Sequence, residues 1–320
     1  MTIKKDNQIG ELIARVDPKR MRRDLFFLAS DPLPSRVLNY VRPGSDKSTL
    51  HEADDFIIDR LESLGYEVER ELVKVQAFQP DLSVPHGFRR PLPDEPWYDS
   101  FNLYARRPAV EHPANVIPAN AGIETPALLD PNEPSPMEAI VLLAHKDSQS
   151  WLDRAPGASD NAVGVVALLE IARLMREVEP TRTVIFLFCN EEHWPWTSVA
   201  AAERLAASSL RIMAVINVDS IGGKSLENAR SGIHTNTTRY STPEGERIAD
   251  LMGRINELYE IGLDQEKAFS GTPNDDDGSF INAGILPTVL NIGSFPYADP
   301  NYHTLGDKPE YVDLANVVKA

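Results

Sequence analysis

The 320-residue sequence has little cysteine and no long apolar run. Its single cysteine, Cys189, excludes an intrachain disulfide and fits a reducing compartment. No stretch of 18 apolar residues occurs, which argues against a membrane-spanning helix. The first residues, MTIKKDNQIGELIARV, are polar and lack the apolar centre of a secretion signal. We therefore expect a cytoplasmic protein with no membrane partner.

Positive charge is also scarce. The 32 basic residues are outnumbered by 48 acidic ones, which gives a net charge of −16. This excess of negative charge disfavours nucleic acid as a partner, although it is equally typical of a soluble surface. Apolar residues make up 42% of the chain, enough for a substantial core. We expect one domain over residues 1–320, without internal repeats.

The first 136 residues divide into a regular part and a proline-rich part. Helical spacing of apolar residues predicts helix over 8–30, with a boundary at Pro18 and Asp17 as a cap, and a second helix over 51–64. Alternation predicts a strand over 67–78. Twelve of the 25 prolines then fall within 79–136. Apart from a short strand at 100–106, we interpret 79–136 as long loops or an insertion, with 111–134 poorly ordered.

From residue 139 onward, short apolar runs alternate with helical patterns. The runs read as buried strands, and they cover 139–144, 183–189, 212–218 and 286–292. Helices are predicted over 161–178, 198–207 and 244–260, then shortly after residue 277, and again from residue 313. This alternation predicts an α/β fold, a three-layer α/β/α sandwich around a mixed, mostly parallel sheet.

Polar residues with metal-binding side chains occur just after these buried strands. The carboxyl ends of parallel strands form the ligand crevice of an α/β sheet, so such residues are expected to converge. Two further candidates lie on loops that can reach the same edge. The set comprises His145, Glu191, Glu192 and Asp219 at strand ends, and Asp160 and His303 on loops.

Each of these residues also has a purely structural interpretation. Without any role in metal binding, Asp160 can be a helix cap, Asp219 can cap a turn, and His303 can be an ordinary loop histidine. An adjacent pair of glutamates is often just a solvated loop. Four of these residues lie at strand ends, and the other two lie on loops that can reach the same edge of the sheet. Their joint occurrence therefore favours a metal site.

The chemistry of the set suits zinc. Catalytic zinc takes nitrogen and oxygen ligands and leaves one position open for water. Two histidines and three carboxylates suit two ions about 3.5–4 Å apart that share one carboxylate, and the remaining glutamate can transfer protons. Asp147 lies two residues after His145 and therefore points to the same side of an extended strand. A carboxylate in that position typically orients a metal-binding imidazole.

Five motifs make the chain resemble a known family. They are AHKDS at 144–148, GASDNAVGV at 157–165, NEE at 190–192, NVDSIG at 217–222 and YHT at 302–304. In order and spacing they are similar to the co-catalytic di-zinc aminopeptidases of metallopeptidase clan MH, which also includes glutamate carboxypeptidase and glutaminyl cyclase. The resemblance covers about residues 17–320.

The resemblance implies a role for each motif residue and two Zn²⁺ ions per chain. His145 and Asp219 would bind one zinc ion, and Glu192 and His303 the other. Asp160 would bridge the two ions. Asp147 would orient His145, and Glu191 would be the general base. In relatives the peptide bond after the bridging aspartate is often cis, which implies the same for the bond between Asp160 and Asn161.

The chain departs from the family pattern at two places. Lys146 stands where relatives usually carry a bulky or aromatic residue. Asp276-Asp277-Gly278-Ser279-Phe280 replaces a frequent Ser-Asp-His segment before the late phenylalanine. Five aromatic residues can line a substrate pocket or pack in the core. One of them is Phe295. The other four are Trp194, Trp196, Tyr297 and Tyr302.

We therefore expect a zinc-dependent exopeptidase, an aminopeptidase that acts on peptides with a free N-terminus. One alternative is a carboxypeptidase or dipeptidase of the same fold, which an arginine placed to bind a substrate carboxylate would favour. Another is an acyltransferase of the glutaminyl cyclase kind with one zinc ion. A non-enzymatic relative is a further alternative, but such members typically lose ligands that this chain retains.

Overall fold

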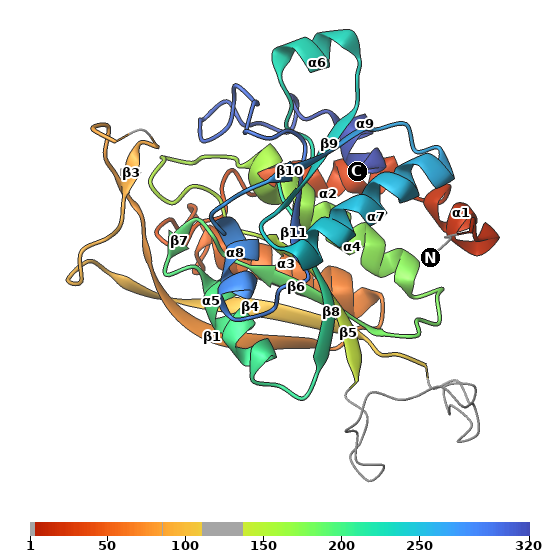
Figure 1. The fold of residues 1–320 in the computed structure, drawn as a ribbon. Helices are drawn as coiled ribbons and strands as arrows, with labels where there is room; N and C mark the ends of the chain where they lie inside the picture. The colour runs from red at the N-terminus through yellow and green to blue at the C-terminus, as the bar shows by residue number, and fades with distance from the viewer. Residues whose placement is uncertain (1–3, 85, 111–136) are drawn as a thin grey trace.

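The computed structural model describes residues 4–84, 86–110 and 137–320. The strands are β1 (Val68–Ala77), β2 (Gln79–Pro80), β3 (Phe88–Arg89), β4 (Trp97–Arg107), β5 (Glu138–His145), β6 (Thr183–Cys189), β7 (His193–Trp194), β8 (Arg211–Val218), β9 (Thr235–Tyr240), β10 (Asp264–Phe269) and β11 (Thr288–Ile292). The helices are α1 (Asn7–Ile13), α2 (Pro18–Ala29), α3 (Thr49–Ser63), α4 (Val163–Met175), α5 (Thr197–Ala206), α6 (Leu226–Ser231), α7 (Pro243–Tyr259), α8 (Asp275–Asn282) and α9 (Leu314–Lys319). Figure 1 shows their arrangement.

One nine-stranded sheet forms the centre of the molecule, in the order β10-β9-β11-β8-β5-β6-β4-β1-β7. Its four central strands, β11, β8, β5 and β6, are parallel to one another. Beyond β6, strands β4 and β1 are added antiparallel, and the parallel pair β9 and β10 joins β11 in the antiparallel sense. The predicted α/β fold with a mixed, largely parallel central sheet is confirmed.

Both faces of the sheet are covered, which explains why its central strands are apolar without alternation. All of β6 is buried. Its residues Phe186 and Phe188 belong to the apolar cluster under α2, α3 and α4. Ile185 and Leu187 belong to the cluster on the opposite face, with α5 and α8. Because successive side chains of a strand alternate between faces, one apolar run supplies both layers.

The helix boundaries agree with the capping signals in the sequence. Asp17 caps α2 by accepting from the backbone N–H groups of Lys19 and Arg20, and Pro18 is the first helical residue. Ser48 caps α3 in the same way. Gly65 follows α3 with φ of +80°, a conformation that favours glycine after a helix end.

Parts of the predicted secondary structure differ from the observed one. Residues 79–99 are not only loop, because they hold the β2–β3 ribbon and the start of β4. Strand β9 was not predicted because its sequence, TNTTRY, is polar, although most of it is buried. The β2–β3 ribbon consists of two residues on each side, too short for a periodic signal. The expected poor order of 111–134 falls outside the described residues.

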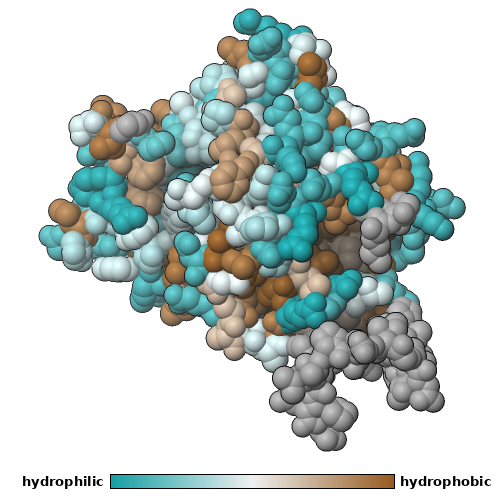
Figure 2. All heavy atoms as spheres, viewed as in Figure 1, coloured by the Kyte–Doolittle hydropathy of each residue, from teal (hydrophilic) through white to brown (hydrophobic). Residues whose placement is uncertain are grey.

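Hydrophilic side chains cover much of the face shown in Figure 2 and are interspersed with smaller hydrophobic groups. Of the helices that the structure describes, none has both the length and the apolar character needed to cross a bilayer. The two large apolar clusters lie between the sheet and its helices.

Candidate metal centre

The parallel strands deliver most of the predicted site residues to one edge of the sheet. His145 is the last residue of β5, and Asp219 follows β8 directly. Glu191 and Glu192 follow the end of β6. Since β6 and β8 flank β5 and run parallel to it, their carboxyl ends lie together. Asp160 and His303 reach this edge from loops, so the structure brings together every residue predicted for the site.

The first cluster contains His145, Asp160 and Asp219, all buried. The Nε2 atom of His145 lies 3.0 Å from Oδ1 of Asp160 and 3.5 Å from Oδ1 of Asp219. One ligand atom from each residue lies within 4.8 Å of the other two. The three side chains therefore surround one point that a cation can occupy.

The second cluster contains Asp160 again, with Glu192 and His303. The Nε2 atom of His303 lies 3.2 Å from Oδ2 of Asp160 and 3.5 Å from Oε1 of Glu192. Asp160 thus turns one carboxylate oxygen toward each histidine. This is the arrangement of a carboxylate shared between two ligand sets.

The charge and donor types of the clusters fit a metal. In the described part of the chain, no lysine or arginine forms an ion pair with Asp160, Asp219 or Glu192. Burial raises the pKa of Glu192 to about 7, and the nearby charge of Asp160 adds to this effect. Burial alone would lower the pKa of His303, but its hydrogen bonds with Asp160 and Glu192 raise it to about 10.

Buried carboxylates without a lysine or arginine partner need another source of positive charge to offset the cost of their desolvation. The available donors are imidazole nitrogen and carboxylate oxygen, which are ligands that zinc accepts. The residues present therefore fit one zinc ion in each cluster.

Asp147 is fully buried and joins the two strand ends. Its Oδ1 accepts from the backbone N–H of Glu191 at 3.0 Å, and its Oδ2 accepts from that of Glu192 at 2.8 Å. Nδ1 of His145 lies 3.3 Å from Oδ1. Burial alone would raise the pKa of Asp147, but hydrogen bonds with His145 and His193 hold it well below its usual range.

His193, which the sequence did not single out, completes the surroundings of Asp147. Its Nδ1 lies 2.8 Å from Oδ2 of Asp147, and its Nε2 lies 3.3 Å from the backbone N–H of Leu38. Because that N–H can only donate, Nε2 accepts and Nδ1 carries the proton. Asp147 therefore orients His145 and also fixes the backbone that presents the two glutamates.

Glu191 lies on the same edge but belongs to neither cluster. Its Oε2 atom is buried and has no hydrogen-bond donor among the described residues. Burial raises its pKa well above the ordinary value, and the charges of Asp276 and Asp275 raise it further. A carboxylate with a free acceptor oxygen and a raised pKa is suited to accept and return a proton.

The turn Ala158–Ala162 holds Asp160 in place. Asp307 accepts from the backbone N–H groups of Ser159, at 2.7 Å, and Asp160, at 3.0 Å. Gln149 donates its amide to Oδ2 of Asp160 at 2.8 Å. The peptide bond between Asp160 and Asn161 is cis, as the resemblance implied. The turn thus aims Asp160 between the clusters.

Asp160 does not cap the following helix, which was its structural alternative. The N-cap residue of α4 is Ala162, and the side chain that bonds its first turn is that of Asn161, whose Oδ1 accepts from the backbone N–H of Gly164 at 2.9 Å. Gly157, at the start of the turn, has φ of +53°, and a Cβ there would lie 2.5 Å from the carbonyl oxygen of Asp160. Glycine is therefore required at this position.

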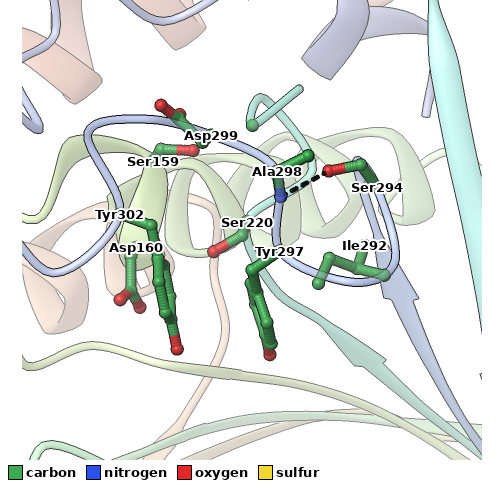
Figure 3. Close-up of a pocket in the computed structure, with 10 residues that line it drawn as sticks. Ser159, Asp160, Ser220, Ile292, Ser294, Tyr297, Ala298, Asp299 and Tyr302 are labelled. Atoms are coloured by element: carbon green, nitrogen blue, oxygen red, sulfur yellow. Dashed lines mark hydrogen bonds between the residues drawn. The ribbon is translucent and has the colours of Figure 1, made fainter. Parts of the chain in front are cut away.

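The loop that carries His303 is ordered by aromatic stacking. The rings of Tyr302 and His303 stack with centroids 3.9 Å apart, and Tyr297 stacks on Tyr302 at 4.4 Å. Figure 3 shows Tyr297 and Tyr302 beside Asp160. On the other side of His303, the Trp151 ring contacts its edge at 5.1 Å. Stacking of this kind fixes the direction of the imidazole.

A cavity of about 320 Å³, the metal cavity, opens beside both clusters. Four of the five aromatic candidates line it, namely Trp194, Trp196, Tyr297 and Tyr302, together with Phe78 and Phe88. Phe295 does not, and lines a different depression. The volume is at the lower end of the range for ligand sites.

The two residues just before the segment that departs from the family pattern, Asn274 and Asp275, line the metal cavity. Asp275 lies on its wall, whereas Asp277 points inward and pairs with the buried Arg239 at 2.8 Å. Arg239 also binds Asp275, at 2.7 Å. Burial raises the pKa of Asp277 to about 7, although Arg239 opposes the rise. Arg239 thus offsets much of the negative charge of Asp275 and Asp277.

Comparison with known proteins identifies the class of protein that this fold and site define. The family model for peptidase family M28 matches residues 127–320, more than half of the chain. The chain therefore belongs to peptidase family M28, and the predicted family resemblance is confirmed.

Particular relatives agree with this assignment. The chain is 25% identical over 198 residues to a probable leucine aminopeptidase of Arthroderma benhamiae, covering 58% of this chain and 52% of that protein. It is 33% identical over 104 residues to a probable zinc metalloprotease of Pyrenophora tritici-repentis, covering 32% and 24%. The chain spans about half or less of the length of these curated relatives.

Solved structures share the fold over almost the whole chain. A glutaminyl cyclase of Bacteroides thetaiotaomicron, bound to N-acetylhistamine, gives a TM-score of 0.65 at 17% identity and covers 95% of this chain and 94% of that one. A Zn-dependent exopeptidase of Parabacteroides distasonis gives 0.64 at 16% identity with the same coverage. At this identity the likeness concerns the fold alone.

Proposed function

We propose that this chain is a zinc-dependent exopeptidase, specifically an aminopeptidase that removes N-terminal residues from peptides. The observation that carries the proposal is the position of Asp160, whose two oxygens face His145 at 3.0 Å and His303 at 3.2 Å. A carboxylate shared in this way suits two metal ions and is not needed for one. Membership of peptidase family M28 supports the reaction class.

In this proposal the two clusters hold one zinc ion each. His145, Asp160 and Asp219 would bind the first, and Asp160, Glu192 and His303 would bind the second. Zinc in these positions supplies Lewis acidity, which polarises a peptide carbonyl and acidifies water.

Glu191 is the proposed proton carrier. Its free Oε2 accepts a proton from the water that attacks the scissile carbonyl, and it returns that proton to the leaving amine. Asp147 supports this step by fixing the backbone N–H of Glu191 at 3.0 Å, so that the side chain stays directed at the cavity. Asp147 also orients His145.

The charge of the metal cavity supports a substrate with a free N-terminus. Two carboxylates on its wall, those of Glu191 and Asp275, lie outside the metal clusters. Asp275 is already paired with Arg239, so Glu191, whose Oε2 has no donor among the described residues, is the carboxylate that can accept from the amino group of a substrate. The aromatic wall is suited to an apolar side chain.

The test is hydrolysis by the zinc-loaded protein of a panel of aminoacyl amides and their N-acetylated counterparts. We expect cleavage of the free amides and little or none of the acetylated ones. Equal rates on both sets would contradict the requirement for a free amine. Cyclisation of N-terminal glutamine without peptide hydrolysis would favour the glutaminyl cyclase alternative.

A further inference from the structure

A second cavity of about 360 Å³ adjoins the metal cavity. Its wall combines apolar residues, among them Pro195, Val199 and Pro273, with polar ones that include Glu203 and Asn282. None of the residues of the metal clusters lies on it. The two cavities share five residues, Arg90, Trp194, Trp196, Asn274 and Asp275. A ligand that begins at the metal centre can therefore extend past Arg90 into the second cavity, where Pro195, Val199 and Pro273 offer apolar contacts.

Arg90 lies on this shared wall. Its guanidinium lies over the Trp194 ring, 3.8 Å from the centroid. Within the described residues no carboxylate forms an ion pair with it, whereas its neighbour Arg89 pairs with Glu95 at 3.0 Å. Stacking uses the face of the guanidinium and leaves the N–H groups at its edge available.

The backbone around Arg90 is held by contacts to β1, although the side chain is exposed. Gln76, which is 3% exposed, donates to the carbonyl oxygens of Leu92 and Glu95 at 2.8 Å each. The Glu95 carboxylate accepts from the backbone N–H of Leu92 at 3.0 Å. The segment after β3 is therefore fixed at several points, and the stack on Trp194 orders the guanidinium in advance of binding.

Three histidines also line the metal cavity, and the exposed His86 among them contacts the Phe88 ring. His145 and His303 belong to the metal clusters. Arg239 does not line the cavity and is paired with Asp275 and Asp277. Arg90 is thus the guanidinium on the described wall that can receive an anion from a ligand. An arginine presents paired N–H donors that match a carboxylate.

From this placement we propose that Arg90 binds the carboxylate of the residue released by cleavage, so that the chain prefers dipeptides. The second cavity receives the apolar side chain of that residue. This proposal rests on the aminopeptidase function proposed above and names its substrate class. It unites two of the activities expected from the sequence, because removal of the N-terminal residue of a dipeptide is also dipeptidase activity.

The first experiment compares a dipeptide with its C-terminal amide, for example Leu-Leu and Leu-Leu-amide, which share the bond that is cleaved. The zinc-loaded wild-type protein should show a kcat/KM at least about tenfold higher for the free acid, mainly through KM, since a charge-assisted pair is lost in the amide. In Arg90→Gln the two values should converge.

Arg22→Gln is the matched control. Arg22 is also an exposed arginine over an aromatic ring, with its guanidinium 4.1 Å from the Phe26 centroid, but it lies on α2 away from both cavities. It should retain the wild-type ratio. Hydrolysis of both peptides at equal kcat/KM by the wild type, or an unchanged ratio in Arg90→Gln, would overturn the proposal while leaving the aminopeptidase function in place.

A binding measurement separates this proposal from the catalytic one. The zinc-loaded Glu191→Gln protein is titrated calorimetrically with Leu-Leu and with Leu-Leu-amide, with and without Arg90→Gln. Tighter binding of the free acid that disappears in Arg90→Gln supports the carboxylate site even if no peptide is hydrolysed. Equal affinity for acid and amide rejects it whatever the turnover.

Discussion

The ammonium of Lys146 lies 2.8 Å from a carboxylate oxygen of Asp54, and the two side chains are 0% and 1% exposed. Lys146 also donates to Oδ1 of Asn190 at 2.8 Å. Asp54 lies on α3, whereas Asn190 immediately precedes Glu191. Burial raises the pKa of Asp54, although Lys146 opposes the rise. The residue that departs from the family pattern thus connects α3 to the segment that carries the glutamates.

We predict that Lys146→Met destabilises the protein by about 3–5 kcal/mol, because it leaves the Asp54 carboxylate buried without a partner. The measurement is the free energy of unfolding from urea titration. The double variant Lys146→Met, Asp54→Leu should regain most of this loss, since a buried ion pair can be replaced by apolar side chains at little cost. A double variant as unstable as the single one would show that the pair is not the cause.

Exchange of the adjacent glutamates should separate proton transfer from metal binding. Glu191→Gln is expected to keep its zinc and lose turnover by about 10²- to 10⁴-fold, the usual contribution of a general acid–base group. Glu192→Gln should instead lower the zinc content, because Glu192 lies in the second cluster. Steady-state kinetics and elemental analysis of both variants test this. Near-normal turnover of Glu191→Gln would mean that the two roles are assigned wrongly.

Arg36 is expected to be essential for stability without touching substrate. It is fully buried, and its guanidinium donates to four carbonyl oxygens, those of Leu28, Lys146, Pro156 and Gly157. Arg36→Met should reduce the free energy of unfolding by at least about 3 kcal/mol, because buried carbonyl groups lose their donors.

Urea titration measures this effect, with Arg22→Gln as the control, for which a change within about 0.5 kcal/mol is expected at an exposed position. A loss below about 1 kcal/mol in Arg36→Met would show that water or a relaxed backbone replaces the guanidinium. The zinc content of Arg36→Met should be measured together with its stability, because Pro156 and Gly157 lead into the turn that carries Asp160.

The sequence allowed the candidate site to be predicted because its residues follow apolar runs. His145 ends a buried strand, Glu192 and Asp219 come just after two others, and the order of the parallel strands then decides where the three residues meet. The motif around Asp160 supplied the shared carboxylate. The same residues lie in the two clusters of the structure.

The frame around the site could not be predicted. Asp307 binds the backbone N–H groups of Ser159 and Asp160, and Arg36 binds backbone carbonyl groups. Main-chain partners leave no spacing or charge pattern in the sequence, so neither residue gave a signal. Arg90 is similar, because an arginine in a proline-rich segment reads as a solvated loop until the fold places it over Trp194.

Some alternatives also depended on the tertiary structure alone. An aromatic residue after a strand can face a cavity or the core, and only the packing of neighbouring elements decides between them. Trp194 and Trp196 face both cavities, whereas Phe295 lies elsewhere. Strand β9 escaped prediction because threonine and asparagine occupy buried positions, where Thr238 and Asn291 satisfy each other by a hydrogen bond of 2.7 Å.

In the proposed function, two zinc ions bind through a shared Asp160 and make hydrolysis possible. The most direct measurement removes metal with a chelator and titrates zinc back while counting bound ions by elemental analysis and following hydrolysis of an aminoacyl amide. We expect activity to be lost when the metal is removed and to recover fully as the zinc content reaches two ions per chain. Full activity at one ion per chain, or activity that survives complete removal of metal, would contradict it.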